Sequence, residues 1–161
     1  MHTITPFLWF DGMAEAAAEY YVSIFPNSRI LQIMRHGEAG REQHGQAPGS
    51  VMTVAFELDG QHFTAINGGP QFKFSRAVSF VVHCKSQAEV DHYWDRLGAG
   101  GPAEAQQCGW LADRYGLSWQ IVPDRLIELL AGPAAGRVMK AMMQMKKLDI
   151  AILERAAENR G

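Results

Sequence analysis

A thiol, a carboxylate and a carboxamide lie close together in the segment 108–123, CGWLADRYGLSWQIVP. A deprotonated cysteine is a nucleophile, and a carboxyl group with a raised pKa transfers protons. Cys108 and Asp113 are therefore the candidate catalytic residues. Gln120 offers a different chemistry, because its amide both donates and accepts hydrogen bonds. In the middle of a strand such an amide needs a partner or a solvated cavity.

Both candidate catalytic residues also have a structural interpretation. Asp113 opens a tight turn in which Gly116 tolerates positive φ and the aspartate bonds forward to the backbone. Cys84 and Cys108 have neither a disulfide framework nor C-x-x-C spacing, so buried, reduced thiols are the simpler interpretation. We expect a turn role for Asp113, and a nucleophilic Cys108 stays open.

The elements that must position these side chains follow from periodicity and turn signals. Residues 117–122 alternate as a β-strand does, so Ser118 and Gln120 share one face and Trp119 the other. Ser86 followed by Glu89 has the spacing of a helix-capping box. The predicted strands are 4–10, 28–36, 51–58, 61–67, 77–84, 104–111 and 117–122, and the predicted helices are 13–25, 86–97 and 136–158.

The two halves repeat one order of elements, a strand, a helix and then strands. This predicts an α+β fold of paired βαβββ modules, residues 3–70 and 76–124, within a single domain over 1–161. A third strand in the last part of the second module is expected but is not separately resolved. The final helix, 136–158, is rich in methionine and has a wide apolar surface, so we expect it to form a homodimer contact.

Composition excludes several classes of function. The chain of 161 residues has a formal net charge of -2 and is 47% hydrophobic, as in a globular protein. Its basic residues are dispersed, which gives no argument for nucleic acid. No apolar run approaches the ~20 residues of a membrane span, and the first ten residues lack signal-peptide features. We expect a cytoplasmic protein.

Four short motifs, FLWF at 7–10, NGGP at 67–70, CGWL at 108–111 and SWQI at 118–121, occur in this order of elements. The chain thereby resembles the PhnB-like branch of the vicinal oxygen chelate superfamily, which includes glyoxalase I, extradiol dioxygenases and bleomycin-resistance proteins. Many members of the branch carry the label 3-demethylubiquinone-9 3-methyltransferase. The resemblance spans nearly the whole chain. It implies paired βαβββ modules (the glyoxalase/bleomycin-resistance fold), a cup-shaped cavity and a homodimer.

In metal-using members of that superfamily, His or Glu residues from four strands hold one divalent ion. Gln120 stands where the resemblance places a glutamate. The other three positions fall on Thr5, on Asn67 or Thr64, and on Ser79 or Ala77. All these side chains are neutral, whereas such cations prefer imidazole and carboxylate ligands. We therefore expect no metal site and no cofactor.

Two further chemistries are disfavoured by context. The strand histidines His62 and His83 supply two ligands without a carboxylate, which falls short of a metal site. The glycine-rich run 98–102, GAGGP, follows a helix, whereas an adenosyl-type methyl donor is bound where a glycine-rich turn follows a strand. Methyl transfer is a third option behind the two functions that follow.

What remains is a cavity with aromatic walls and neutral hydrogen-bonding groups, the usual form of a small-molecule site. The expected ligand-binding residues are Thr5, Trp9, Asn67, Ser79, Trp110, Trp119 and Gln120. Each tryptophan could instead be part of the core. The first hypothesis is a metal-independent small-molecule binding protein. The alternative is a lyase, isomerase or transferase, either metal-dependent or based on Cys108 or Asp113; a structural dimer with a filled core is a further possibility.

Overall fold

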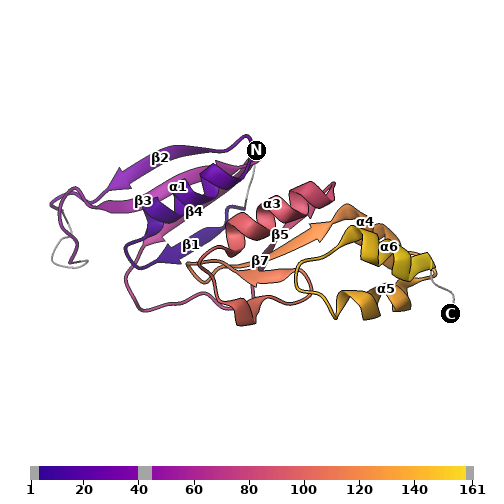
Figure 1. Cartoon of the computed structure of the whole chain (residues 1–161). Coiled ribbons are helices and arrows are strands. Elements are labelled where there is room, and N and C mark those ends of the chain that lie inside the picture. The colour runs from indigo at the N-terminus through magenta and orange to yellow at the C-terminus, as the bar shows by residue number, and fades with distance from the viewer. Residues whose placement is uncertain (1–3, 40–44, 159–161) are drawn as a thin grey trace. The chain divides into compact units, whose positions relative to one another are not determined.

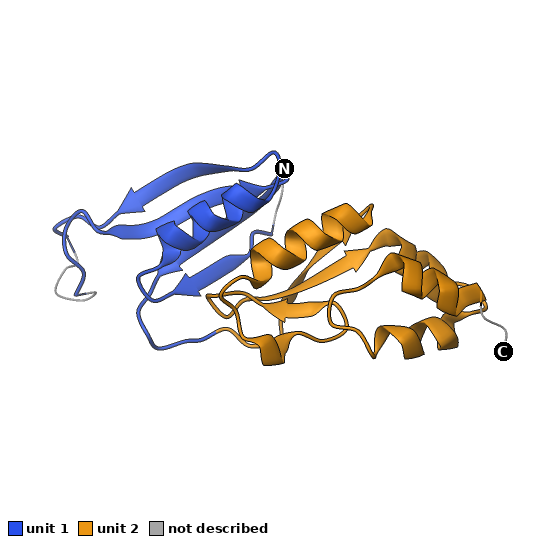
Figure 2. Cartoon of the chain, in the orientation of Figure 1, with its two compact units in different colours: residues 1–73 blue, residues 74–161 orange. Residues whose placement is uncertain are grey.

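The computed structural model describes residues 4–39 and 45–158 and has an α+β fold (Figure 1). The chain divides into two compact units, residues 1–73 and 74–161 (Figure 2). Each unit has its own sheet, with helices that cover it.

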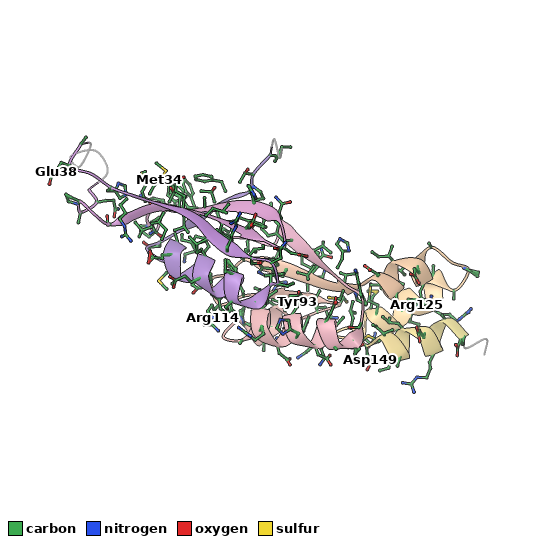
Figure 3. All side chains as sticks on the ribbon, turned by 90° about the horizontal axis from the view of Figure 1, so that it is seen from above. Met34, Glu38, Tyr93, Arg114, Arg125 and Asp149 are labelled. Atoms are coloured by element: carbon green, nitrogen blue, oxygen red, sulfur yellow. The ribbon has the colours of Figure 1, made fainter. Side chains whose placement is uncertain are left out.

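Unit 1 has the predicted βαβββ order. Its elements are β1 (Phe7–Phe10), α1 (Ala14–Ile24), β2 (Arg29–Arg35), β3 (Val51–Leu58) and β4 (Gln61–Asn67). The sheet order is β1-β4-β3-β2, with β1 parallel to β4 and the other pairs antiparallel. The edge strand β2 leaves large apolar side chains exposed, among them Met34 (Figure 3).

Helix α1 lies on this sheet through the predicted apolar stripe. Its buried residues are Ala14, Ala17, Ala18, Tyr21 and Ile24. The alanines allow a close approach, and the ring of Tyr21 stacks on Phe56, which in turn stacks on Phe63. This apolar contact is the core of unit 1.

Unit 2 begins with β5 (Ser79–Cys84), α3 (Gln87–Gly98), the 3₁₀ turn η1 (Ala103–Ala105), β6 (Trp110–Ala112) and β7 (Ser118–Pro123). The sheet order is β5-β7-β6, with β5 parallel to β7. Its first and last strands therefore pair in parallel, as they do in unit 1. The strand predicted over 104–111 is mostly a turn, and beyond β6 only the single bridge Gln107–Trp110 extends the pairing within the described residues.

Three helices follow the second sheet: α4 (Asp124–Leu130), α5 (Ala135–Met142) and α6 (Ile150–Glu158). Helix α4 was not predicted. The predicted C-terminal helix is present but is divided in two, because the carbonyls of Met145 and Lys146 accept hydrogen bonds from residues 108 and 109. The Asp149 carboxylate then caps α6 through the Ile152 N–H (Figure 3).

The three helices have a small core of their own. Its buried members are Leu126, Ala134, Val138, Leu148 and Leu153. Arg125 on α4 also pairs with Glu154 on α6 at 3.0 Å. Among the described residues, none of the helices is long and apolar enough to cross a bilayer.

Candidate functional site

Ser79 and Gln120 lie side by side on one face of the unit 2 sheet. The Gln120 Nε2 donates a 3.0 Å hydrogen bond to the Ser79 Oγ, and both residues are half-buried. Trp110 is the cross-strand partner of Gln120 in β6, so its side chain shares this face. The structure thus brings together three predicted ligand-binding residues. We call Ser79, Trp110 and Gln120 the polar face of unit 2.

A cleft of about 370 Å³ opens beside β6. Its lining comprises Arg76, Ala105, Gln107, Cys108, Trp110, Leu111, Ala112 and Ser118. Trp110 belongs both to this cleft and to the polar face, although Ser79 and Gln120 are not among the lining residues of the cleft. We take the polar face and the cleft together as the candidate site. Sequence reasoning missed the contributions of Arg76 and Gln107, since neither belongs to a motif.

Of the two thiols, only Cys108 belongs to the cleft. It is half-buried, and its Sγ accepts a 3.4 Å contact from the Gln107 Nε2. Cys84 is fully buried, and burial raises the pKa of its thiol to about 12. Cys84 is therefore a core residue, and Cys108 is the thiol that a ligand can reach.

Asp113 and Trp119 are in the core of unit 2, 1% and 3% exposed. The Asp113 Oδ1 accepts hydrogen bonds from the N–H groups of Tyr115 and Leu117, which confirms the predicted turn role. Its Oδ2 accepts from the Trp119 indole at 2.9 Å. A carboxylate bonded in this way organises the turn, and its position gives no support to a catalytic role.

The remaining predicted residues lie in unit 1. The Asn67 Oδ1 accepts from the Ala14 N–H at the start of α1, and its Nδ2 donates to the Val51 carbonyl. The Trp9 indole donates to the Gly69 carbonyl at 2.9 Å. Thr5 is exposed just before β1. The polar groups of Trp9 and Asn67 thus have partners within the protein, and their ligand-binding role stays a prediction.

A second cleft, of about 490 Å³, lies in unit 1 and includes Asn67. Three carboxylates, Asp11, Glu15 and Glu19, line it. The Arg35 guanidinium lies 3.9 Å from the Glu15 carboxylate. This cleft is acidic, in contrast to the cleft beside β6.

Over residues 4–39 and 45–158, no three His, Cys, Asp or Glu side chains gather in a way that could hold a metal ion. His62 lies 3.2 Å from the Glu57 carboxylate in unit 1, and His83 lies 3.9 Å from Asp124 in unit 2. Each histidine therefore has one acidic neighbour in its own unit.

The sequence profile of the family described as 3-demethylubiquinone-9 3-methyltransferase matches residues 2–122. The chain belongs to this family. One member of known structure, a Bacillus cereus PhnB protein described as a putative 3-demethylubiquinone-9 3-methyltransferase, is 33% identical with a TM-score of 0.66. The match covers 76% of this chain and 99% of that one. No curated protein matches the sequence significantly.

Two more distant structures share the fold of the family member. Protein PA1353 from Pseudomonas aeruginosa is 17% identical with a TM-score of 0.57, over 76% of this chain and 98% of that chain. The fosfomycin resistance protein FosX from Listeria monocytogenes is 17% identical with a TM-score of 0.52, over 80% and 96%. The predicted glyoxalase/bleomycin-resistance fold and the PhnB-like resemblance are thus confirmed.

Proposed function

We propose that this family member is a metal-independent small-molecule binding protein whose ligand lies on the polar face of unit 2 and in the adjoining cleft. One observation carries the proposal. Gln120 occupies a position at which the superfamily resemblance places a metal ligand, and Ser79 is one of the two candidates, with Ala77, for another. Here Ser79 and Gln120 are neutral and hydrogen-bonded to each other. The polar face therefore has converging polar groups, as a metal site does, but these groups are a neutral amide and a neutral hydroxyl.

This donor set does not fit a divalent cation. Zinc and similar ions bind imidazole, thiolate or carboxylate groups, which carry charge or a strong lone pair. The Gln120 Nε2 is a hydrogen-bond donor, and the Ser79 hydroxyl is a weak neutral ligand. These groups recognise instead a neutral ligand that carries both donors and acceptors.

Trp110 indicates the rest of the ligand. Its half-buried indole adjoins the cleft, and flat aromatic surface favours planar apolar groups. The cleft volume, about 370 Å³, is that of a site for a small organic molecule. The proposal is therefore an amphipathic aromatic ligand, with its planar part beside Trp110 and its polar part at Gln120.

A thermal-shift screen of aromatic amphiphiles, followed by equilibrium dialysis of the best compound, tests this proposal. Gln120→Leu should weaken binding at least about tenfold, since a buried ligand group loses its hydrogen bond. Gln61→Leu, in the unit 1 hairpin, is the matched control and should bind as the native protein does. A stoichiometric metal in the purified protein, no binding in the screen, or unchanged binding by Gln120→Leu would overturn it.

Methyl transfer, which the family description suggests, is the second candidate. The glycine-rich run begins at the last residue of α3 and leads into η1, so it does not follow a strand as an adenosyl-donor loop does. Calorimetric titration with S-adenosylmethionine should show no binding. Measurable affinity would favour the methyltransferase instead. An enzyme based on Cys108 is distinguished by turnover that alkylation of this thiol abolishes.

The expected homodimer also stays a proposal. Light scattering coupled to gel filtration measures it directly, and a monomer at micromolar concentration would contradict it.

A further inference from the structure

The helices α4 to α6 lie outside the part of the chain that the family profile matches. The profile ends at residue 122, before α4 begins. The Bacillus cereus protein is matched over 99% of its length by only 76% of this chain. We call residues 124–158 the C-terminal extension. Its contacts with the rest of unit 2 are thus a feature beyond the matched core.

The loop between α5 and α6 pairs with the chain just before β6. The Cys108 N–H donates to the Met145 carbonyl and the Gly109 N–H to the Lys146 carbonyl, both at 2.8 Å. The Gln107 Nε2 donates to the Met143 carbonyl at 2.9 Å. Three consecutive residues before β6 are therefore held by the extension.

Gly109 joins the extension to the sheet. Its carbonyl accepts a 2.8 Å hydrogen bond from the Ile121 N–H in β7, while its own N–H is bonded to the loop. Its φ is +85°, and a Cβ here would lie 2.9 Å from the Leu148 Cδ1. Cys108 also has positive φ, at 53°. Residues 108 and 109 therefore have a backbone conformation that side chains disfavour, and the hydrogen bonds to the loop stabilise it.

The α5–α6 loop also has contacts with helix α3. The Gln87 Nε2 at the start of α3 donates to the Leu148 carbonyl at 3.0 Å, and its Oε1 accepts from the Ile150 N–H at 2.8 Å. Lys147 adds a 3.0 Å ion pair with Asp91 of the same helix. The loop is thus fixed to α3 on one side and to residues 107–109 on the other.

Gln107 and Cys108 are also lining residues of the cleft beside β6. We propose that the C-terminal extension holds this wall of the cleft in place and so limits the width of the ligand that enters. Gln107 and Gly109 act as positioning residues, and Gln87 acts through the loop. The limit on ligand width rests on the proposed function. The position of the wall does not, because it can be measured without a ligand.

Gln87→Ala tests the inference, because it removes both bonds to the loop from a residue outside the cleft. The rate at which iodoacetamide alkylates Cys108 at pH 8, measured by peptide mass spectrometry, shows how often this wall of the cleft opens. We expect the rate to rise by about fivefold, because local opening becomes more populated. Arg137→Ala is the control, since it weakens contacts between α5 and the end of α6 without touching the loop. Its Cys108 should react at the native rate.

Two probes of different width, indole and carbazole, supply the second measurement by equilibrium dialysis. Gln87→Ala should shift their affinity ratio toward carbazole by about fivefold, while Arg137→Ala leaves it unchanged. If Gln87→Ala leaves the alkylation rate unchanged, the held wall is contradicted. If the rate rises while the affinity ratio stays the same, the limit on ligand width is contradicted. If neither probe nor any compound of the screen binds the native protein, the proposed function fails, and a faster alkylation still supports the held wall. Gly109→Ala should give the same changes if it folds.

Discussion

The indole N–H of Trp119 and the carboxylate of Asp113 form a 2.9 Å hydrogen bond inside unit 2, where both residues are shielded from solvent. Two backbone N–H groups of the turn, those of Tyr115 and Leu117, also donate to the carboxylate. A buried carboxylate is tolerated because its acceptors are used, and removing one partner leaves the others uncompensated. The turn before β7 and the core beneath it are therefore coupled through one side chain.

Asp113→Ala should lower the free energy of unfolding by about 3 kcal/mol, because three hydrogen bonds to a charged acceptor are lost. Trp119→Phe should cost about 2–3 kcal/mol, since it removes the indole donor and leaves a cavity where the larger ring was packed. Urea unfolding followed by circular dichroism measures both. In the Asp113→Ala background the cost of Trp119→Phe should fall by about 1 kcal/mol, because the hydrogen bond is already absent and only the lost packing remains. Strictly additive costs would contradict the coupling.

Asn67 should contribute to stability by capping a helix from outside it. Met13 precedes α1 without a capping side chain, and the Asn67 Oδ1 bonds the Ala14 N–H in its place. Asn67→Ala removes this cap and also the bond from the Asn67 Nδ2 to the Val51 carbonyl, and should lower the free energy of unfolding by about 1–2 kcal/mol. Ser23→Ala, on the exposed side of α1, is the control and should change it by less than about 0.5 kcal/mol. Equal effects of the two substitutions would show that the cap contributes nothing.

Stability should fall in alkaline solution partly because of Cys84. Its pKa is raised from 9.0 to about 12 by burial, so the folded protein keeps the thiol proton that the unfolded chain releases. The stabilising contribution is complete below pH 9 and decreases as the pH rises from 9 toward 12. Urea midpoints measured from pH 8 to 11 should fall less steeply in Cys84→Ala. Parallel slopes would contradict this assignment.

Two substitutions can replace the neutral side chains of the polar face with groups that bind metal ions. Ser79→His combined with Gln120→Glu places an imidazole beside a carboxylate, and zinc affinity should rise at least about tenfold over the native protein. Isothermal titration with zinc measures the change. Gln61→Glu adds the same charge in unit 1 and should have no such effect. If the native protein binds zinc as tightly as the double variant does, the neutral side chains at 79 and 120 are not what excludes the metal.

Local signals predicted much of the fold. Ser86 caps α3 through the Glu89 N–H, as the capping-box spacing indicated. The strands predicted over 51–58 and 61–67 are β3 and β4, and the alternation after Gly116 correctly placed Gln120 on the same face as Ser118. These features depend on neighbours in sequence, which is why they could be read without a structure.

Features that depend on distant partners could not be predicted. The methionine-rich stretch 136–158 has helical periodicity throughout, yet its middle carbonyls bond to residues 108 and 109. Trp119 can be buried because its indole N–H donates a hydrogen bond to the carboxylate of Asp113, six positions earlier. The pairing of Ser79 with Gln120 depends on the parallel register of β5 and β7, which leaves no mark in either strand.

The contact of the α5–α6 loop with residues 107–109 affects how specificity can diverge within this family. If the C-terminal extension holds the cleft wall as proposed, substitutions in the extension change the shape of the cleft while every residue that lines it stays the same. Relatives with identical lining residues but different tails should then differ in the molecules they accept. Comparison of such relatives should therefore begin with the segment that follows the last strand.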